Sequence, residues 1–257
     1  MKRLIILVAA ALSLCGCAVL QSRNWDVNQL LNAAANATTA ITLTDTQIQQ
    51  LSAQTVAQLD AQNTVEAANG PYTKRLAKIL DGIDNLNGLP LNFKVYKTNE
   101  INAFACGDGS IRVYSGLMDV MTDEEVFAIL GHEIGHVANK DTKRAMQNAY
   151  AAAAARNVAG AAGGTIGTLA NSMLGDIAES YVNAQFSQKQ EFGADDYGFH
   201  YAVDHGKDPY SMYNSLNKLM SVSGGSKGSS LQQMFSTHPD TSERAARMKA
   251  KADAVKK

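Results

Sequence analysis

Two histidines and a glutamate in the string HEIGH, at His132, Glu133 and His136, have the types and spacing that zinc-dependent hydrolysis requires. On a helix, the two imidazoles project from one face and can bind one zinc ion through neutral nitrogens. The carboxylate between them then lies beside the metal, where it can act as a general base for an attacking water. The five His and eight Glu of the 257 residues would produce roughly 0.003 such strings by chance. The string therefore predicts a hydrolytic zinc site.

The residues around this string predict the helix that it requires. Thr122 stands three residues before Glu125, which is a capping-box signature for a helix start. An apolar stripe at helical spacing follows, at Val126, Leu130 and Val137, with the two histidines on its flank. The same pattern would also fit a buried structural helix whose histidines only satisfy hydrogen bonds.

A hydrolytic zinc site also needs a third protein ligand and one open coordination position. Asn139 and Thr142 stand where a metzincin has Gly and His, so the third ligand must come from further along the chain. Glu191 and Asp195, in the string EFGAD, are four residues apart and would face the same way on a helix. One carboxylate can bind zinc while the other accepts the spare N–H of a ligating histidine. Taken alone, the pair also fits a solvated helix face, and the rival ligands are Glu179, His200 and His205.

A third segment, STHPD, brings His238 next to a rigid proline after the flexible run 224–230. Its imidazole could reach over the metal and donate a hydrogen bond to the developing oxyanion. It could instead occupy the open zinc position in the resting protein and exclude water. A purely structural role, capping a helix that starts near Thr241, is the third possibility.

Two helices and a small sheet are expected to precede the HEIGH helix. Apolar residues at helical spacing mark one helix over 48–59 and a second that opens at Pro71, includes Ile83 and stops near residues 88–90. Alternating apolar residues predict a half-buried strand over 91–95. Two further short strands are expected at 102–106 and 111–115. The fold class expected is therefore α+β, mostly helical, with a small mixed or antiparallel sheet.

The stretch 149–170 is rich in Ala and Gly and contains two GxxxG spacings. Arg156 and Asn157 interrupt its apolar run, so it favours close helix packing or a mobile flap over a membrane span. A further helix is expected over 209–222, ahead of the segment that bears His238.

The N-terminus predicts a bacterial lipoprotein. Two basic residues precede an apolar run of eleven residues, 4–14, which is too short to span a bilayer but suits a signal peptide. The string LCGC that ends at Cys17 resembles a lipobox, in which Cys17 is acylated and becomes the first mature residue. Ala18 after this cysteine favours sorting of the lipoprotein to the outer membrane, where the protein would face the periplasm. Ordinary signal cleavage without lipid is the alternative.

This assignment divides the chain into a signal peptide (1–16), a lipidated tether (17–40) and one folded domain (41–257). After processing, Cys106 would be the remaining thiol, so no internal disulfide is expected, and we assign this thiol no catalytic role. The processed chain would keep 21 Lys and Arg against 24 Asp and Glu, a formal charge of −3. A near-neutral charge without a basic block argues against nucleic acid as a partner.

Five motifs occur in an order that resembles the HtpX-like gluzincin metallopeptidases: NAFA (102–105), IRVYSGL (111–117), HEIGH, EFGAD and THPD. Among that family, the chain is most similar to the small periplasmic lipoprotein members of the LoiP type. The resemblance covers residues 40 to 250 and implies a zincin fold for the domain 41–257.

The resemblance also implies roles for individual residues. His132, His136 and Glu191 would bind one zinc ion per chain, Glu133 would be the general base, and Asp195 would orient a ligating histidine. His238 would lie at the active site. An edge strand would lie beside it, formed by Asn102, Ala103, Phe104 and Ala105.

The family is associated with endoproteolysis of damaged, unfolded or misassembled envelope proteins, and these would be the substrates. An extended peptide that pairs with the edge strand would be bound with little side-chain selectivity. Envelope assembly machinery would be a further partner, and lipid at Cys17 would hold the protein on the membrane. The alternative function, that of a binding protein and not an enzyme, is a zinc-stabilised module that binds client proteins without cutting them. Glu133 separates the two, because a structural zinc site has no use for a base.

Overall fold

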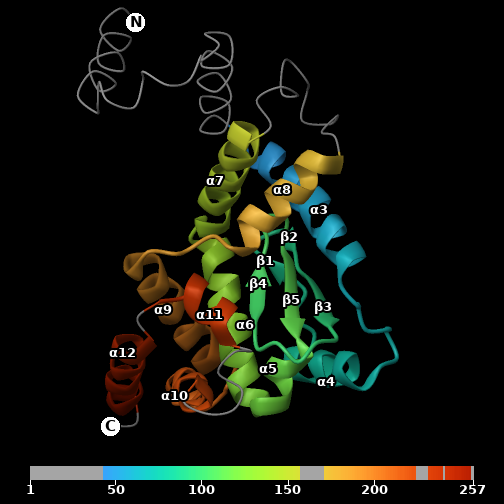
Figure 1. The fold of residues 1–257 in the computed structure, drawn as a ribbon. Coiled ribbons are helices and arrows are strands. Elements are labelled where there is room, and N and C mark those ends of the chain that lie inside the picture. Colours follow the sequence, from blue (N-terminus) through green and yellow to red (C-terminus); the bar gives the residue numbers. More distant parts are fainter. Residues whose placement is uncertain (1–42, 157–170, 224–230, 240, 256–257) are drawn as a thin grey trace, which may run out of the picture.

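The centre of the fold is a small mixed sheet followed by the helix that carries HEIGH (Figure 1). The computed structural model describes residues 43–156, 171–223, 231–239 and 241–255. The predicted signal peptide, lipobox and tether lie outside the described residues, as do the Gly-rich part 157–170 and the run 224–230.

Three strands form the sheet in the order β3-β5-β4: β3 (Asn92–Tyr96), β4 (Ala103–Ala105) and β5 (Ser110–Tyr114). β3 and β5 are parallel, whereas β4 is antiparallel to β5 and lies at one edge. The expected α+β class with a small mixed sheet is therefore confirmed.

The predicted helix that starts at Pro71 ends earlier than its apolar spacing suggested. α4 (Pro71–Leu80) stops because Asp81 takes a left-handed conformation, with φ at 47°. Ile83 therefore lies outside the helix. It leads into a hairpin that the sequence analysis did not predict, formed by β1 (Asn85–Leu86) and β2 (Leu89–Pro90) around an Asn-Gly turn.

Side chains of the sheet alternate between two faces, as strand geometry requires. The face toward the HEIGH helix is apolar, with Phe93, Val95, Ala103, Ala105, Ile111 and Val113. The opposite face packs against α3 (Asp45–Gln62). There Asp60 of α3 accepts hydrogen bonds from buried Arg112, from Lys94 and from Tyr96. This ion pair fixes α3 on the sheet.

The helix α6 (Asp123–Ala138) begins at the predicted capping box and carries HEIGH. The Thr122 hydroxyl accepts from the Glu125 main chain, and the Glu125 carboxylate accepts from the Thr122 main chain at 2.8 Å. The sequence predicted burial of only one apolar stripe of this helix, with the histidines on its flank, and the structure shows more extensive burial. Every residue from Glu125 to Val137 is buried, so neighbouring elements enclose this helix on all sides.

The main chains of α6 and α9 (Gln188–Asp204) come into direct contact. A Cβ atom at Gly131 of α6 would lie 3.1 Å from the Cα of Gly198 in α9. A Cβ atom at Gly198 would lie 2.8 Å from the main-chain nitrogen of His132. Glycine at both positions permits this approach, which brings EFGAD next to HEIGH although the strings are almost sixty residues apart.

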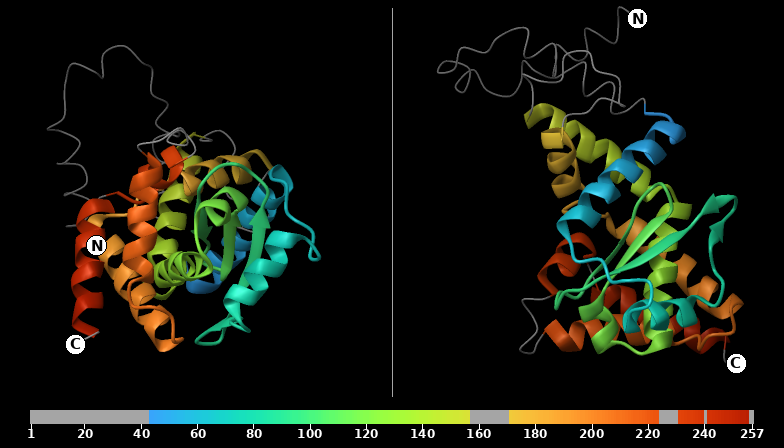
Figure 2. Two further views of the ribbon diagram at one scale, coloured as in Figure 1. Left: turned by 90° about the horizontal axis from the view of Figure 1, so that it is seen from below. Right: turned by 90° about the vertical axis from the view of Figure 1, so that its right-hand side faces the viewer.

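The remaining helices form two groups on either side of this centre (Figure 2). α7 (Asp141–Arg156) and α8 (Asn171–Val182) pack with α3 at the top of Figure 1. α10 (Ser211–Ser223), which confirms the helix expected over 209–222, packs with α12 (Thr241–Val255) beside α9. The short helices are α5 (Ser115–Val120) and α11 (Gln232–Thr237).

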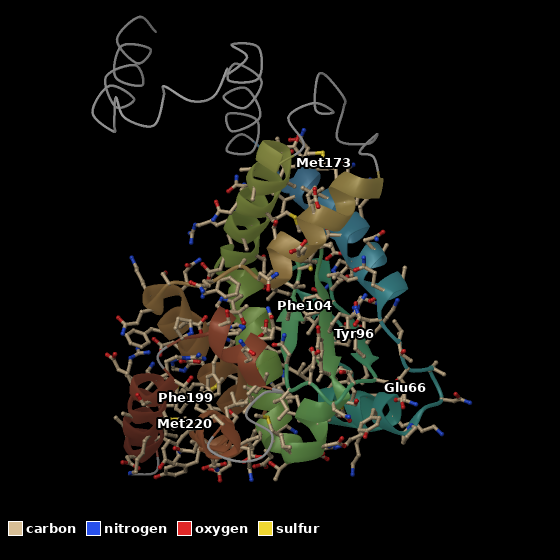
Figure 3. The ribbon with its side chains drawn as sticks, viewed as in Figure 1. Glu66, Tyr96, Phe104, Met173, Phe199 and Met220 are labelled. Carbon is tan, nitrogen blue, oxygen red and sulfur yellow. The ribbon has the colours of Figure 1, made fainter. Side chains whose placement is uncertain are left out.

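Figure 3 labels one or two side chains of each group: Met173 in the upper group, Tyr96 and Phe104 at the sheet, Phe199 and Met220 beside α12. None of the described helices has an apolar stretch long enough to cross a bilayer.

Candidate active site and metal centre

Four buried side chains from three segments converge beneath the edge strand. His132 and His136 come from α6, Glu191 from the first turn of α9, and His238 from the residue that follows α11. One ligand atom from each lies within 4.8 Å of the others. The group can therefore hold a metal ion, and its members include the two histidines and the glutamate that the sequence singled out.

Each histidine of HEIGH has its Nδ1 atom engaged by a carboxylate. The Nδ1–H of His132 donates to Asp195 at 2.9 Å, and the Nδ1–H of His136 donates to Asp141 at 3.1 Å. These bonds turn both Nε2 atoms toward each other, 3.1 Å apart, where each can bind a metal ion once its ring is neutral. Asp195 therefore has the partner that the sequence analysis proposed for it.

The spacing of the ligand atoms fits a tetrahedral zinc site. Zinc bonds of about 2.0–2.1 Å place two ligand atoms roughly 3.3–3.4 Å apart. The two Nε2 atoms are 3.1 Å apart, and Oε1 of Glu191 lies 3.4 Å from Nε2 of His136. Two imidazole nitrogens with one carboxylate are also the donor set typical of hydrolytic zinc sites.

Burial and neighbouring charges shift the pKa values of the two histidines in opposite directions. Burial lowers the pKa of His132 below its usual 6.5, despite the hydrogen bond to Asp195. Burial also acts on His136, but its bonds to Asp141 and Glu191 outweigh that effect and raise its pKa to about 9. The carboxylates that favour a positive charge on His136 also favour a metal cation in the same place.

The carboxylates of α9 stay ionised in spite of their burial. Burial disfavours the charged form of Asp195, but hydrogen bonds and charge from Arg244 lower its pKa to about 2. Burial acts on Glu191 in the same sense, and the charge of His238 with the hydrogen bond from His136 lowers its pKa far below the usual value. Arg244 is itself buried and within 2.6 Å of Glu191.

Glu133 lies beside this group without a partner for one of its oxygens. Its carboxylate is buried, and Oε1 has no hydrogen-bond partner among the described residues. The Nε2 atom of His238 is 3.8 Å away from it. A buried carboxylate oxygen left unpaired is costly, so its retention beside a metal-binding group points to a functional role.

The side chain of His238 is directed into the metal-binding group. Its Nδ1 atom lies 3.0 Å from Oε1 of Glu191 and 3.4 Å from Nε2 of His132. Phe186 covers the site next to it: its ring stacks on that of His136 at 4.0 Å between centroids and lies 5.4 Å from that of His238.

The rival ligands lie elsewhere. Glu179, His200 and His205 are all exposed, and none belongs to the group of four. Cys106 follows β4 directly and is buried, and burial raises the pKa of its thiol above the usual value.

Strand β4 forms one wall of a pocket that Glu133 and His238 also line. Phe104 exchanges main-chain bonds with β5, so the main-chain groups of Ala103 and Ala105 point to the free edge. Asn102, just before the strand, is buried, and its side chain accepts from the Ala103 N–H at 3.0 Å.

A second outward group of β4, the Ala105 carbonyl, also has a partner within the chain. The hydroxyl of Tyr181, at the end of α8, donates to the carbonyl of Ala105 at 2.6 Å. Tyr181 is buried, and its neighbours Val182, Ala184 and Phe186 line the same pocket. The segment after α8 thus lies across the free edge of the strand.

Comparison with known proteins shows which family this chain belongs to. A model of peptidase family M48 matches residues 73–252. The chain belongs to peptidase family M48. It is 42% identical to metalloprotease LoiP of Escherichia coli K12 over 99% of both chains. It is 39% identical to metalloprotease YcaL of the same organism, over 95% of this chain and 94% of that one.

Protease HtpX of Xylella fastidiosa is more distant, at 31% identity over 60% of this chain and 65% of its own. These findings agree with the family resemblance in the motifs, and the chain is a metalloprotease. A client-binding module that does not cut is therefore disfavoured.

The roles of two residues of this M48 peptidase site were not predicted from the sequence. Asp141, the first residue of α7, bonds to His136, to Arg144 and to Gln190. The signal was an acidic residue at the start of a new helix only five positions after His136. The left-handed Lys140, with φ at 60°, is what turns the chain there. Arg244 lies 49 residues beyond Asp195, and no periodic pattern links the two.

Proposed function

We propose that this M48 peptidase is a zinc-dependent endopeptidase in which His132, His136 and Glu191 bind the metal and Glu133 is the general base. The observation that carries the proposal is the buried group of two imidazole Nε2 atoms and one carboxylate, with an unpaired oxygen of Glu133 beside it. Bound zinc polarises the substrate carbonyl and acidifies a water. Glu133 takes the proton of the attacking water and can return it to the leaving amine.

The direct test is casein digestion by purified protein that lacks residues 1–17. We expect digestion that a chelator abolishes and added zinc restores. Undiminished digestion after complete removal of metal would contradict the proposal. Glu191→Ala should lose stoichiometric zinc, and the exposed Glu179→Ala is the matched control that should keep it.

His238 has two proposed roles, and its geometry supports one of them in this conformation. An oxyanion donor must face the substrate carbonyl, whereas Nδ1 of His238 lies among the ligand atoms at 3.0 and 3.4 Å. We therefore propose that His238 occupies the open metal position in the resting protein and leaves it when substrate binds. Proteolysis by His238→Ala should then rise, while a loss of roughly 10²–10³-fold in turnover would favour the oxyanion role.

We propose that unfolded polypeptides bind as an added strand along β4. Supporting this are the outward main-chain groups of Ala103 and Ala105, which lie beside the pocket that Glu133 lines. Main-chain pairing gives affinity without demanding one particular side-chain sequence. Damaged or misassembled envelope proteins would expose such extended segments.

We also propose an outer-membrane location facing the periplasm, with a lipid anchor at Cys17 and envelope assembly machinery within reach as a partner. The support is the sequence of the first eighteen residues, with its short apolar run and lipobox-like end. Cys17→Ser should release the protein from membranes. Fractionation of this variant with the envelope at high salt would count against lipid anchoring.

A further inference from the structure

We propose that Arg244 is a positioning residue that holds one oxygen of Glu191 away from the metal, so that Glu191 binds zinc through a single oxygen. The inference rests on the proposed zinc site. It concerns a residue of α12 that follows the His238 segment and touches neither substrate nor metal.

The guanidinium of Arg244 is fixed in orientation by Asp195. Its Nε and Nη2 atoms each donate to one oxygen of Asp195, both at 2.8 Å. A planar guanidinium held by two parallel bonds has one remaining orientation for its third nitrogen. Arg244 is only 3% exposed, so the surrounding residues restrict it further.

That third nitrogen reaches Glu191. Nη1 of Arg244 lies 2.6 Å from Oε2 of Glu191, a contact whose angles make it an ion pair more than a hydrogen bond. The other oxygen, Oε1, lies closer to the histidines, 3.4 Å from Nε2 of His136 and 3.0 Å from Nδ1 of His238, whereas Oε2 is 3.7 Å from Nε2 of His132. Oε2 is thus the oxygen that pairs with the guanidinium, and Oε1 is the one nearer to the other ligand atoms.

This division bears on the coordination number of the metal. A zinc ion bound by both oxygens would have to share Oε2 with the guanidinium, and two cations at that distance repel each other. One-oxygen binding uses three positions of a four-coordinate ion for protein ligands. The fourth is then left for His238 in the resting protein and for water or substrate during hydrolysis.

Lysine is the informative replacement for Arg244 because it keeps the positive charge but lacks the planar guanidinium with its several N–H donors. A single ammonium group cannot donate two parallel hydrogen bonds to Asp195 and also form the ion pair with Glu191. In Arg244→Lys we expect Glu191 to bind through both oxygens. Zinc affinity should fall by roughly 10–100-fold, as it does when groups that orient ligands are changed.

The test uses the full chain with Co²⁺ in place of zinc, together with a zinc titration against a chromophoric chelator. A four-coordinate Co²⁺ site absorbs strongly in the visible range, and a five-coordinate site absorbs weakly. We expect weaker absorption in Arg244→Lys than in the wild type. The matched control is Arg247→Lys, one turn along α12, where a half-exposed arginine bonds Asp196. Its Co²⁺ spectrum and zinc affinity should be unchanged.

An Arg244→Lys variant with a wild-type spectrum and wild-type zinc affinity would overturn the inference. If the variant does not fold, X-ray absorption and a crystal structure of the zinc-loaded wild type decide the question. Both oxygens of Glu191 at about 2.0–2.2 Å from zinc would overturn the inference, and one such oxygen would support it. A wild type that binds no zinc would instead contradict the proposed function.

Discussion

At the scale of single residues, the unpaired oxygen of Glu133 leads to the clearest prediction. Glu133→Gln keeps the size of the side chain and the zinc ligands but removes the base. We expect stoichiometric zinc in this variant and proteolysis reduced by at least roughly 10²–10⁴-fold, the contribution typical of a general base. Casein turnover and metal content measured on the same sample check both statements. Wild-type turnover would remove Glu133 from the mechanism.

The hydrogen bonds behind the two histidines lead to a second prediction at this scale. Asp141→Asn and Asp195→Asn both remove a carboxylate that accepts from a histidine Nδ1. Each should weaken zinc binding by roughly 10–100-fold, because the ring loses its fixed orientation and tautomer. Competition with a chelator measures the effect.

Asp196→Asn is the control for both variants. Asp196 neighbours Asp195 in the sequence, but its carboxylate pairs with Arg247 and Lys251 on the partly exposed side of α9. Its zinc affinity should equal that of the wild type. Equal affinities in all three variants would show that these carboxylates do not support the metal.

At the scale of elements, the contact between α8 and β4 controls access to the proposed substrate edge. Tyr181 holds the Ala105 carbonyl that an incoming strand would need, and burial raises the pKa of Tyr181 so that it remains a neutral donor. Tyr181→Phe frees this carbonyl with little change in packing. We expect a lower KM for unfolded substrates, since a competing internal bond has been removed.

Steady-state kinetics on a fluorogenic peptide and on casein measure this effect. Tyr150→Phe is the control, because Tyr150 is also buried in the upper helix group but lies on α7. A raised KM in Tyr181→Phe would mean that the hydroxyl assists substrate binding and does not oppose it.

At the scale of the whole molecule, the ion pair that fixes α3 on the sheet predicts how stability depends on pH. Burial disfavours the charged form of Asp60, but hydrogen bonds from Arg112, Lys94 and Tyr96 lower its pKa from 3.8 to about 2. A carboxylate whose pKa is lowered by folding adds stability above pH 4 and loses it as the pH falls toward 2. Asp60→Asn should therefore reduce the free energy of unfolding at pH 7 by about 1–2 kcal/mol, allowing for solvent screening.

Urea unfolding of Asp60→Asn and the wild type between pH 7 and pH 2 checks this dependence. The difference between the two should shrink as the pH falls through this range. The exposed Asp84→Asn is the control. A difference that stays constant with pH would show that the loss comes from packing and not from charge.

Local patterns predicted much of this fold and part of the site. HEIGH, its capping box and the strands around 91–115 were recognisable because each depends only on residues close together in the sequence. Asp141 was missed because its bond to His136 depends on a sharp left-handed turn at Lys140. Tyr181 and Arg244 were missed because their contacts join helices whose mutual positions no periodicity encodes. Ile83 was misassigned because apolar spacing continued after the helix had ended at Asp81.

The glycine contact between α6 and α9 has a consequence for which ions the protein accepts. Two of the proposed ligands lie on α6 and the third on α9, and the main chains of these helices are in contact at Gly131 and Gly198. The backbone therefore holds the two helices at their closest approach, which suits the short bonds of zinc. Calcium, which needs six or more oxygen atoms at about 2.3–2.6 Å, would have to push the helices apart. We therefore expect the site to favour small cations with short bonds over large ones.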